Sequence, residues 1–286
     1  MESHLKSREK SEVDWHWLQT EIFIRDNGKI RLPHISIDIV KGCNMSCEHC
    51  SHLSPLMHGH YPKEDLLSSL AAWSKKLQPK RFAILGGEPL LHPYFEEIVL
   101  SAHLHWNESE IVVVSNGTLL EKLNDSFLWD CGKLGRIRFD ISQHIESPEW
   151  VKKFELAQKC FSVYGVPITL RQAYSKWMVI YQQSDDSRYI PHHSSPQKSW
   201  DVCAGRSFYK IHDGNLWYCT RLSSIHLAAQ EGLFGEEWNR ILQHQPMRLE
   251  NTQEEILTYL KQAALPECSM CPEMVEVIDA RQMPLL

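Results

Sequence analysis

Three cysteines lie within eight consecutive positions, at Cys43, Cys47 and Cys50, and this spacing allows three interpretations. A structural zinc site needs four ligands, but His49 and His52 lie too close to Cys50 to complete tetrahedral geometry well. A thioredoxin-like redox pair would use only Cys47 and Cys50. A [4Fe–4S] cluster would use all three thiolates and leave its fourth iron open to another ligand. The triplet follows the first expected strand of an α/β unit, where a barrel places its active site, and this favours the cluster.

Four further cysteines form a second set with ligand-like spacing. Cys203 and Cys219 flank a glycine, Gly214, and Cys268 and Cys271 form a CxxC pair. Four thiolates are enough to hold one [4Fe–4S] cluster, although the same pattern also fits a zinc ribbon. The other two of the nine cysteines are expected to be small buried side chains near helices: Cys131 and Cys160.

Composition and charge exclude several classes of protein. The chain has 286 residues, 43% of them hydrophobic, which allows one large core or a core with a small appendage. Its net charge of −6, with both signs scattered, argues against nucleic acid as a partner. The sequence has no signal-peptide h-region and no apolar run near the roughly 18 residues of a membrane span. We therefore expect a soluble, cytoplasmic protein with no membrane partner, in which clustered thiols bind metal or do redox chemistry.

Strand-like and helix-like stretches alternate through the first two thirds of the sequence. Five strands are expected, at Ile35–Val40, Phe82–Leu85, Ile111–Ser115, Ile137–Ser142 and Ile168–Arg171. Four helices are expected between them, at Asp65–Leu77, Tyr94–His103, Leu119–Trp129 and Pro148–Tyr164. This order predicts an α/β fold with a parallel sheet, in the form of a partial (β/α)6-type TIM barrel.

The remaining stretches predict what surrounds this barrel. Two hairpins are expected around the turns Asp26-Asn27-Gly28 and Asp213-Gly214. A loop is expected at Ser184–Ser199, and a helix at Glu250–Ala263. The second hairpin and this helix would form a small C-terminal cluster-binding extension. Three parts follow: an N-terminal extension with a hairpin (1–34), a barrel core (35–199) and an auxiliary cluster domain (200–286).

The motifs that follow the expected strands resemble the signature of the radical SAM superfamily. CxxxCxxC follows the first strand. Gly86-Gly87-Glu88-Pro89 lies 36 positions after Cys50 and follows the second strand, as the GGEP element of the family does. Ser115-Asn116-Gly117 follows the third strand, as the family's S/T-N-G element does. The resemblance covers about residues 35 to 171, and it departs from the family pattern at His49, where an aromatic residue is usual.

The resemblance implies a [4Fe–4S] cluster at the triplet whose open iron binds S-adenosylmethionine. One electron from the reduced cluster would cleave this cofactor to methionine and a 5′-deoxyadenosyl radical, which abstracts hydrogen from a substrate. The implied cofactor-binding residues are Gly86, Gly87, Glu88, Pro89, Ser115, Asn116, Asp140, Ser142, Arg171 and His49. The two glycines would let the backbone approach the methionine part. Glu88 would accept from its ammonium group and Arg171 would bind its carboxylate.

Strand alternation supports part of this assignment. Ile137, Phe139 and Ile141 point to one side of their strand, and the polar residues between them point to the other. Asp140 and Ser142 would therefore face the barrel interior, near the ribose of the cofactor.

The second cysteine set resembles the twitch extension of some radical SAM enzymes. The pattern C-x10-G-x4-C followed by C-x2-C is a shortened form of the longer SPASM extension, whose further cysteines are missing here. The resemblance implies one auxiliary [4Fe–4S] cluster, held by the four cysteines of this set. Full ligation by cysteine suits an electron acceptor. The first cluster would be reduced by a partner such as flavodoxin or ferredoxin.

Three functional hypotheses follow. The first is an oxidoreductase-type radical SAM enzyme of natural-product biosynthesis that oxidises or otherwise modifies a small polar molecule, because twitch-bearing aminocyclitol dehydrogenases are similar in size and cysteine layout. The second is a maturase of a ribosomally synthesised peptide. Since only 34 residues precede the first expected strand, it would need a separate leader-peptide recognition protein. The third is a non-catalytic iron–sulfur or zinc scaffold. Candidate catalytic residues are His144, Arg221 and Tyr209, and candidate substrate contacts also include His52, His58, His60 and Arg206.

Overall fold

The computed structural model describes residues 21–173, 177–184 and 188–278. Most of the expected N-terminal extension, residues 1–20, lies outside this part. The main sheet contains β1 (Phe23–Ile24), β2 (Ile30–Val40), β3 (Leu77–Gly86), β4 (Glu110–Ser115), β5 (Ile137–Gln143), β6 (Ile168–Gln172), β10 (Tyr209–His212) and β11 (Asn215–Trp217). Its strand order is β11-β10-β2-β3-β4-β5-β6, with β1 paired to β2.

The main sheet is mostly parallel. Strands β2 to β6 pair in parallel in sequence order. On the other side of β2, β10 also pairs in parallel, with Tyr209 opposite Ile35, and β11 closes the sheet as an antiparallel hairpin partner. The expected α/β class with a parallel sheet is therefore confirmed. The C-terminal hairpin continues the same sheet.

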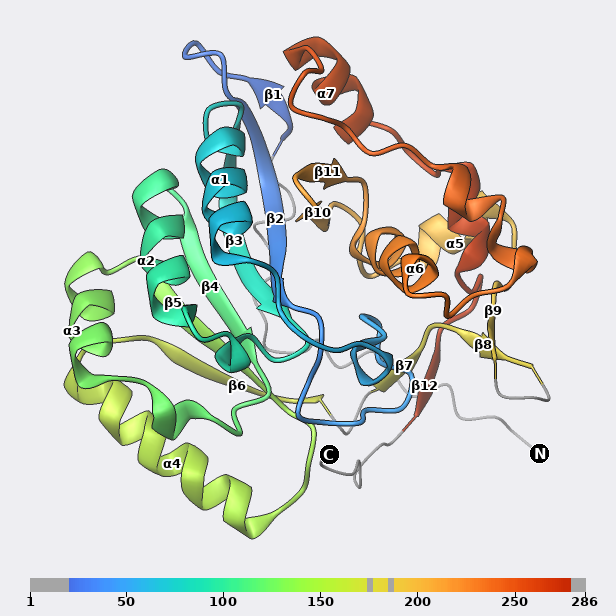
Figure 1. Ribbon diagram of the computed structural model, residues 1–286. Coiled ribbons are helices and arrows are strands. Elements are labelled where there is room, and N and C mark those ends of the chain that lie inside the picture. Colours follow the sequence, from blue (N-terminus) through green and yellow to red (C-terminus); the bar gives the residue numbers. More distant parts are fainter. Residues whose placement is uncertain (1–20, 174–176, 185–187, 279–286) are drawn as a thin grey trace, which may run out of the picture.

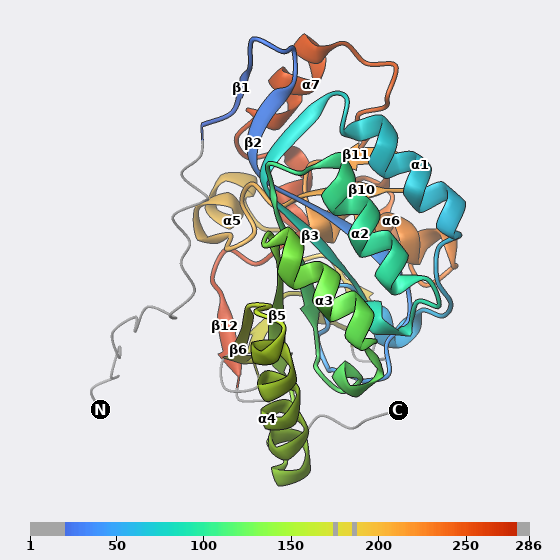
Figure 2. The same cartoon turned by 90° about the vertical axis from the view of Figure 1, so that its left-hand side faces the viewer.

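Helices cover the two faces of this sheet in different ways. Four helices connect its parallel strands: α1 (Lys63–Trp73), α2 (Phe95–His105), α3 (Asp125–Leu134) and α4 (Pro148–Val163). They lie together on one face, and the C-terminal helices lie on the other side of β2 (Figures 1 and 2). The C-terminal helices are α5 (Pro196–Val202), α6 (Thr220–Gln230), α7 (Gln253–Leu260) and the short 3-10 helix η8 (Pro266–Met270).

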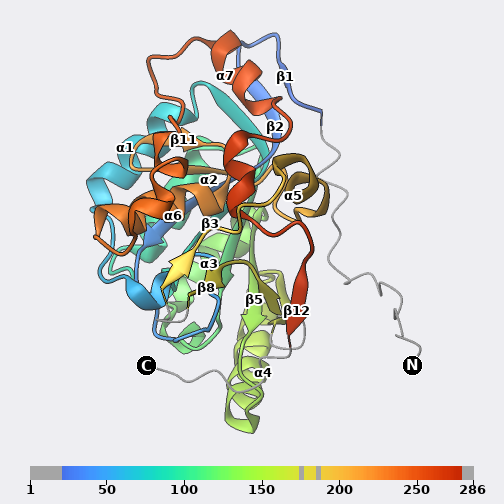
Figure 3. The same cartoon turned by 90° about the vertical axis from the view of Figure 1, so that its right-hand side faces the viewer.

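Two small sheets complete the structure. β7 (Trp177–Val179) pairs with β12 (Glu276–Ile278), and β8 (Gln182–Gln183) pairs with β9 (Tyr189–Ile190). Figure 3 shows β12 and β8 on the side of the molecule that carries α5 and α6. None of the helices in the described ranges has the length and apolar character needed to cross a membrane.

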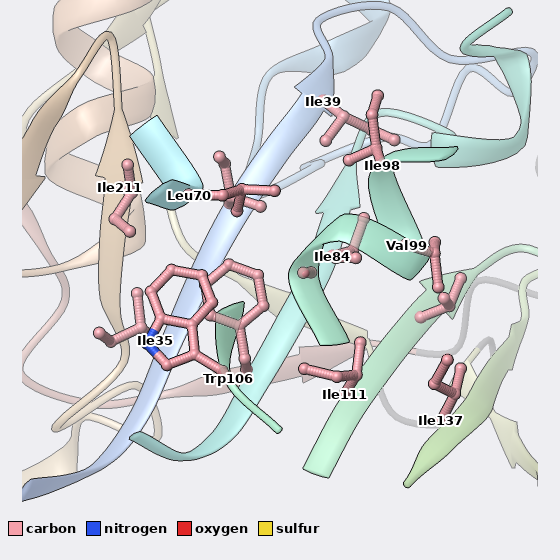
Figure 4. Packing of buried hydrophobic residues seen from close by; sticks show 14 of the residues in the cluster. Ile35, Ile39, Leu70, Ile84, Ile98, Val99, Trp106, Ile111, Ile137 and Ile211 are labelled. Carbon is pink, nitrogen blue, oxygen red and sulfur yellow. The ribbon is translucent and has the colours of Figure 1, made fainter. Parts of the chain in front are cut away.

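The core lies between the sheet and helices α1 to α4. On β2, Ile35 and Ile39 point toward these helices, where they meet Leu70 of α1 and Ile98 of α2 (Figure 4). All four side chains are fully buried. Because side chains alternate along a strand, Ser36 and Asp38 point to the opposite face of the sheet. That face carries polar groups, and it is where the site is built.

The structure also corrects several expected bounds. β2 runs without a break through Pro33, whereas the second strand of the expected N-terminal hairpin and the strand Ile35–Val40 were expected to be separate. Leu77 begins β3 instead of ending α1. The expected loop at 184–199 contains the start of α5, because Pro196 occupies the first turn of that helix, where a proline needs no amide partner. Helix α6 was not expected at all.

Candidate metal and cofactor site

The cysteine triplet lies in the loop after β2, at the carboxyl edge of the parallel sheet. Its three sulfurs pack with Met45 and Ile145 in a small buried cluster. Burial raises the pKa of Cys43 to about 11, and burial together with the neighbouring thiols raises that of Cys47 to about 12. These thiols stay protonated near neutral pH unless a cation joins them, and a coordinating metal deprotonates a thiol outright. The donor set therefore fits a metal group that supplies positive charge.

The geometry also bears on which metal group fits. Within the described ranges, no three His, Cys, Asp or Glu side chains converge closely enough to hold one metal ion. Zinc would need four ligands that meet within about 2.3 Å of a single point. The thiolates of an iron–sulfur cluster each bind a different iron, so they need not converge. At the second set, the choice between an iron–sulfur cluster and zinc therefore stays a prediction.

Glu88 joins the GGEP turn to the Ser-Asn-Gly turn. Its carboxylate accepts from Ser115 Oγ and from the backbone amide of Asn116, each at 2.8 Å, and from the amide of Leu90 at 3.2 Å. Burial raises the pKa of Glu88 to about 7, although these hydrogen bonds favour its charged form. Since protein donors occupy both oxygens, this side chain positions the two turns. Its contact with an ammonium group stays a prediction.

The Ser-Asn-Gly turn in turn holds the cysteine loop. The side-chain amide of Asn116 donates to Asn44 Oδ1 at 2.9 Å and to Cys43 Sγ at 3.6 Å. Its oxygen accepts from the amide and the hydroxyl of Thr118. The three predicted motifs are thus brought together in one network, which runs from Glu88 through Asn116 to Cys43.

The two glycines of GGEP make a close backbone contact that the sequence did not reveal. The amide of Gly87 donates to Val40 O at 2.9 Å, and that of Glu88 donates to Gly42 O at 3.1 Å. A Cβ on Gly87 would lie only 1.8 Å from Gly42 O, and one on Gly86 2.3 Å from Val40 O. Glycine is therefore required here for the approach of the protein's own chain, whatever a cofactor also needs.

Pro89 and His49 are two further predicted cofactor-binding residues at this edge of the sheet. Pro89 is buried and begins a short 3-10 helix after Glu88. His49 lies between Cys47 and Cys50 with a φ of 54°, in the left-handed region. Its Nε2 lies 4.0 Å from Glu48 Oε1, and its role at the cofactor stays a prediction.

Asp140 is the centre of an ion-pair network on the polar face of the sheet. It pairs with Arg81 of β3, with Arg138 at 2.7 Å, and it accepts from Thr169 at 2.6 Å. Burial alone would raise its pKa, but the two arginines and the hydrogen bond from Thr169 together hold it below its usual value. The predicted ribose contact must therefore compete with these partners.

The ends of β5 and β6 bring three further predicted residues together. Arg171 Nη2 donates to Ser142 Oγ at 2.9 Å. Burial lowers the pKa of His144 to about 4, and the nearby charge of Arg171 lowers it too. His144 is accordingly a neutral imidazole at pH 7, which can accept a proton or a hydrogen bond.

The second cysteine set is assembled from three separate segments. Cys203 ends α5, Cys219 is the N-cap of α6 and accepts from the amide of Leu222 at 3.4 Å, and Cys268 and Cys271 lie in and after η8. Burial raises the pKa of Cys219 to about 12, and the charges of Cys271 and Cys203 raise it further. The charges of Cys271 and Cys203 act on Cys268 in the same way. Ser199 of α5 donates to Cys271 O at 2.9 Å, and the amide of Cys271 donates to Cys268 O at 3.1 Å, so α5 and η8 bring these segments together.

The predicted catalytic residues near this set have different surroundings. Arg221 Nη1 donates to Cys271 Sγ at 3.4 Å, so its charge lies beside the sulfurs. Tyr209 is buried in the core, and its hydroxyl donates to Leu260 O at 2.6 Å. Arg206 is exposed and donates to the backbone oxygen of Cys203 at 3.2 Å. Of the three, only Arg221 contacts a thiol.

One buried group was missed by the sequence reasoning. Asp38 of β2 and Lys210 of β10 form an ion pair, and both are buried. His52 lies beside them, with its Nε2 3.9 Å from Asp38 Oδ1. Strand alternation gave a usable signal, because Asp38 lies between Ile37 and Ile39 on a strand whose isoleucines face the helices.

Comparison with known proteins identifies the central part of the chain. Residues 37–159 match the family model described as the Radical SAM superfamily. These residues therefore form a radical SAM domain, and the resemblance expected from the motifs is confirmed for them. The family implies a [4Fe–4S] cluster that binds S-adenosylmethionine.

Curated relatives match shorter stretches of the chain. A GTP 3′,8-cyclase of Helicobacter pylori is 31% identical over 97 residues, which are 32% of this chain and 30% of that protein. Another from a second Helicobacter pylori strain is 28% identical over 133 residues, or 45% and 39% of the two chains. A third, from Microcystis aeruginosa, is 27% identical over 118 residues, or 39% and 35%. The chain thus spans 30–39% of the length of these relatives.

Solved structures also overlap with the chain. BtrN in complex with AdoMet and 2-DOIA covers 89% of this chain and 97% of its own, at a TM-score of 0.47 and 15% identity. Native anSMEcpe with bound AdoMet and Cp18Cys peptide covers 48% and 42%, at a TM-score of 0.36 and 22% identity. Since both TM-scores are below 0.5, the family assignment rests on the sequence match.

Proposed function

We propose that the chain is a radical SAM enzyme that removes a hydrogen atom from a small polar substrate. The proposal starts from the radical SAM domain of residues 37–159. The observation that carries the proposal is the network from Glu88 through Asn116 to Cys43, because it fixes three family motifs around one group of thiols. When the cluster and S-adenosylmethionine are bound, one-electron cleavage of the cofactor supplies a 5′-deoxyadenosyl radical for this step.

The roles of the residues in this site follow from where they lie. Cys43, Cys47 and Cys50 would hold the cluster at the carboxyl edge of the sheet. The turns after β3 and β4 would present backbone groups to the cofactor, with Glu88 holding them in register. Arg171, at the end of β6, would bind the carboxylate of the cofactor through its fork of donors. Strands β10 and β2 to β6 would form the wall of a partial (β/α)6-type barrel around it.

The second cysteine set would hold an auxiliary [4Fe–4S] cluster in a twitch-like extension. Two contacts support this part of the proposal: the half-buried guanidinium of Arg221 donates to Cys271 Sγ, and Ser199 of α5 donates to Cys271 O. The cluster would act as an electron acceptor. After a hydrogen atom is removed from an alcohol carbon, the resulting radical must lose one electron and its hydroxyl proton to become a carbonyl group. The cluster would take the electron, and a neutral group such as His144 would take the proton.

The polar face of the sheet supports a small hydroxyl-bearing substrate of the sugar or aminocyclitol type. Arginines, a neutral histidine and serine hydroxyls lie there, and these groups bind hydroxyls well. We infer a cytoplasmic enzyme reduced by flavodoxin or ferredoxin. The curated relatives are named GTP 3′,8-cyclases, so GTP belongs in any panel of substrates that is tested.

The experiment that tests this function measures iron, sulfide and cofactor cleavage together. The purified protein would be reconstituted anaerobically and assayed for 5′-deoxyadenosine under dithionite. About eight irons per chain, with cleavage, are expected for two such clusters. About four irons per chain, with cleavage, would show that the auxiliary cluster is absent and would exclude its role as an electron acceptor. No iron and no cleavage would overturn the enzyme assignment in favour of a zinc scaffold.

A further inference from the structure

The ion pair of Asp38 and Lys210 is a charged group buried inside the polar face of the main sheet. Asp38 comes from β2 and Lys210 from β10, and the two strands pair in parallel. Lys210 is 1% exposed and Asp38 is 9% exposed. A charge that is buried in this way needs partners for all of its hydrogen-bonding atoms. The ion pair supplies a partner for only one oxygen of the carboxylate, Oδ2.

Two atoms next to the ion pair are left without a partner. Among the residues described, neither Asp38 Oδ1 nor His52 Nε2 has a hydrogen-bond partner, and both atoms are buried. They lie 3.9 Å apart, which is too far for a hydrogen bond between them. A third atom that lies off the line between them can bond to both. Unpartnered buried atoms that face one another in this way indicate a place for a polar group from outside the chain.

The neighbouring groups determine which hydrogen bonds a bound group could make between Asp38 Oδ1 and His52 Nε2. His52 Nδ1 lies 3.3 Å from Ser51 Oγ. If the serine hydroxyl donates to Nδ1, the proton of the neutral imidazole is on Nε2, which then donates. Asp38 Oδ1 can only accept. With this tautomer, the group that fits between them donates one hydrogen bond and accepts another, as a hydroxyl does.

The charge balance selects a neutral group over a cation. Lys210 already neutralises Asp38, and a second ammonium group would be repelled by it at short range. A carboxylate or phosphate would be repelled by Asp38. The pair therefore favours an uncharged hydroxyl.

This place lies between the two cysteine sets. β2 carries Asp38 and leads into the triplet, His52 follows Cys50 by two residues, and Lys210 lies on the hairpin between Cys203 and Cys219. Tyr181 confirms that the two sets approach each other here. Its hydroxyl donates to Ser51 O at 2.9 Å, and its side chain belongs to the same buried cluster as Leu53 and Cys271.

We propose that Asp38, Lys210 and His52 form a subsite that binds a hydroxyl group of a neutral cyclic polyol. The hydroxyl would donate to Asp38 Oδ1 and accept from His52 Nε2, while Lys210 holds the carboxylate in place. This inference rests on the proposed function and deepens it. A substrate that gives a hydrogen atom at the first cysteine set and an electron toward the second has to lie between them, and this subsite would hold it there.

The test uses the reconstituted holoprotein with S-adenosylmethionine and measures binding of radiolabelled myo-inositol by anaerobic equilibrium dialysis. The double variant Asp38→Leu/Lys210→Met removes the charges together, because replacing both partners of a buried pair by apolar residues preserves folding better than removing one. The wild type is expected to bind saturably, and the double variant to bind at least tenfold more weakly. The matched control is Lys63→Met/Glu97→Leu, which removes an ion pair of 3.2 Å at the surface and is expected to bind as the wild type does.

The outcomes separate this inference from the proposed function. Cleavage of S-adenosylmethionine by the wild type tests the function, and it does not depend on the subsite. If the wild type cleaves the cofactor but does not bind myo-inositol, scyllo-inositol or glucose saturably, the subsite is wrong. It is also wrong if the double variant binds as the wild type does. Should the double variant lose iron or unfold, His52→Phe takes its place, and unchanged binding in that variant overturns the inference.

Discussion

The two cysteine sets are built in opposite ways. The first takes its three thiols from one loop of eight residues after β2, and backbone hydrogen bonds from the GGEP turn hold that loop on the sheet edge. The second takes four thiols from the end of α5, the start of α6 and η8. Side-chain contacts hold these segments together, such as the hydrogen bond of 2.9 Å from Ser199 Oγ to Cys271 O.

Because of this difference, we expect single substitutions to affect the two sites differently. The loop of the first set is hydrogen-bonded to the central strands. A substitution there is therefore expected to disturb the sheet and the cofactor site together. The second set lies at the junctions of helices that pack beside the sheet. Its thiols should be removable one at a time without disturbing the first set.

The largest expected effect comes from one thiol of each set. Cys47→Ala should reduce 5′-deoxyadenosine formation to background, because two thiolates hold a cluster poorly. Cys268→Ala should leave cofactor cleavage in place and remove about four irons per chain. Cys160→Ala, outside both sets, is the control and should change neither. Retained cleavage in Cys47→Ala would contradict the assignment of the first site, and unchanged iron in Cys268→Ala would contradict that of the second.

A glycine from each region tests how tightly each is packed. Gly87→Ala would place a Cβ 1.8 Å from Gly42 O, whereas Gly205→Ala would meet only Cys203 Sγ at 3.8 Å. Backbone must move in the first case, so we expect Gly87→Ala to lower the free energy of unfolding by about 1–3 kcal/mol or more. Gly205→Ala should change it by less than about 0.5 kcal/mol. Chemical denaturation of both variants measures this, and equal losses would show that the two regions are equally constrained.

Most of the central sheet could be predicted because its signals are local. The alternation of apolar residues and turns gives β2 to β6 in order. Helix α6 gave no such signal, since Leu222, Ile225 and Ala228 are buried together with Ser223 and Ser224. A helix that is buried on several faces has no apolar stripe to recognise. The pairing of β10 with β2 joins residues about 170 positions apart, and no local pattern in a sequence encodes such a contact.

The site could be predicted where a motif carries it and not where partners come from other strands. The triplet, GGEP and Ser-Asn-Gly are contiguous in sequence, and the structure brings them together. The partners of Asp140 come from β3 and β6, so its ion pairs depend on the register of the sheet. The same is true of Asp38, whose partner Lys210 lies on a strand that sequence reasoning assigned to another domain.

A smaller effect should come from the hydroxyl that links the two turns of the first site. Ser115→Ala removes the hydrogen bond to Glu88, and a bond to a charged group is worth about 1.5–3 kcal/mol. Because burial raises the pKa of Glu88 to about 7, the carboxyl is ionised at pH 8 and protonated at pH 5. The loss of unfolding free energy should therefore be greater at pH 8 than at pH 5. Ser126→Ala, on an exposed position of α3, is the control, and an equal loss at both pH values would show that Glu88 is not titrating in this range.

The smallest change is expected at the second site, where Arg221 should tune a potential without being needed for assembly. Its guanidinium donates to Cys271 Sγ, while Arg206 donates to a backbone oxygen of Cys203. A positive charge near a cluster favours the reduced, more negative form, so Arg221→Gln should lower the reduction potential of the auxiliary cluster. A unit charge at about 4 Å is worth roughly 1–4 kcal/mol between water and the protein surface, or on the order of 50–200 mV for one electron. Arg206→Gln should leave the potential unchanged in a redox titration followed by EPR. If both variants shift the reduction potential equally, the contact of Arg221 with Cys271 does not set that potential. The net charge around the cluster would then determine it.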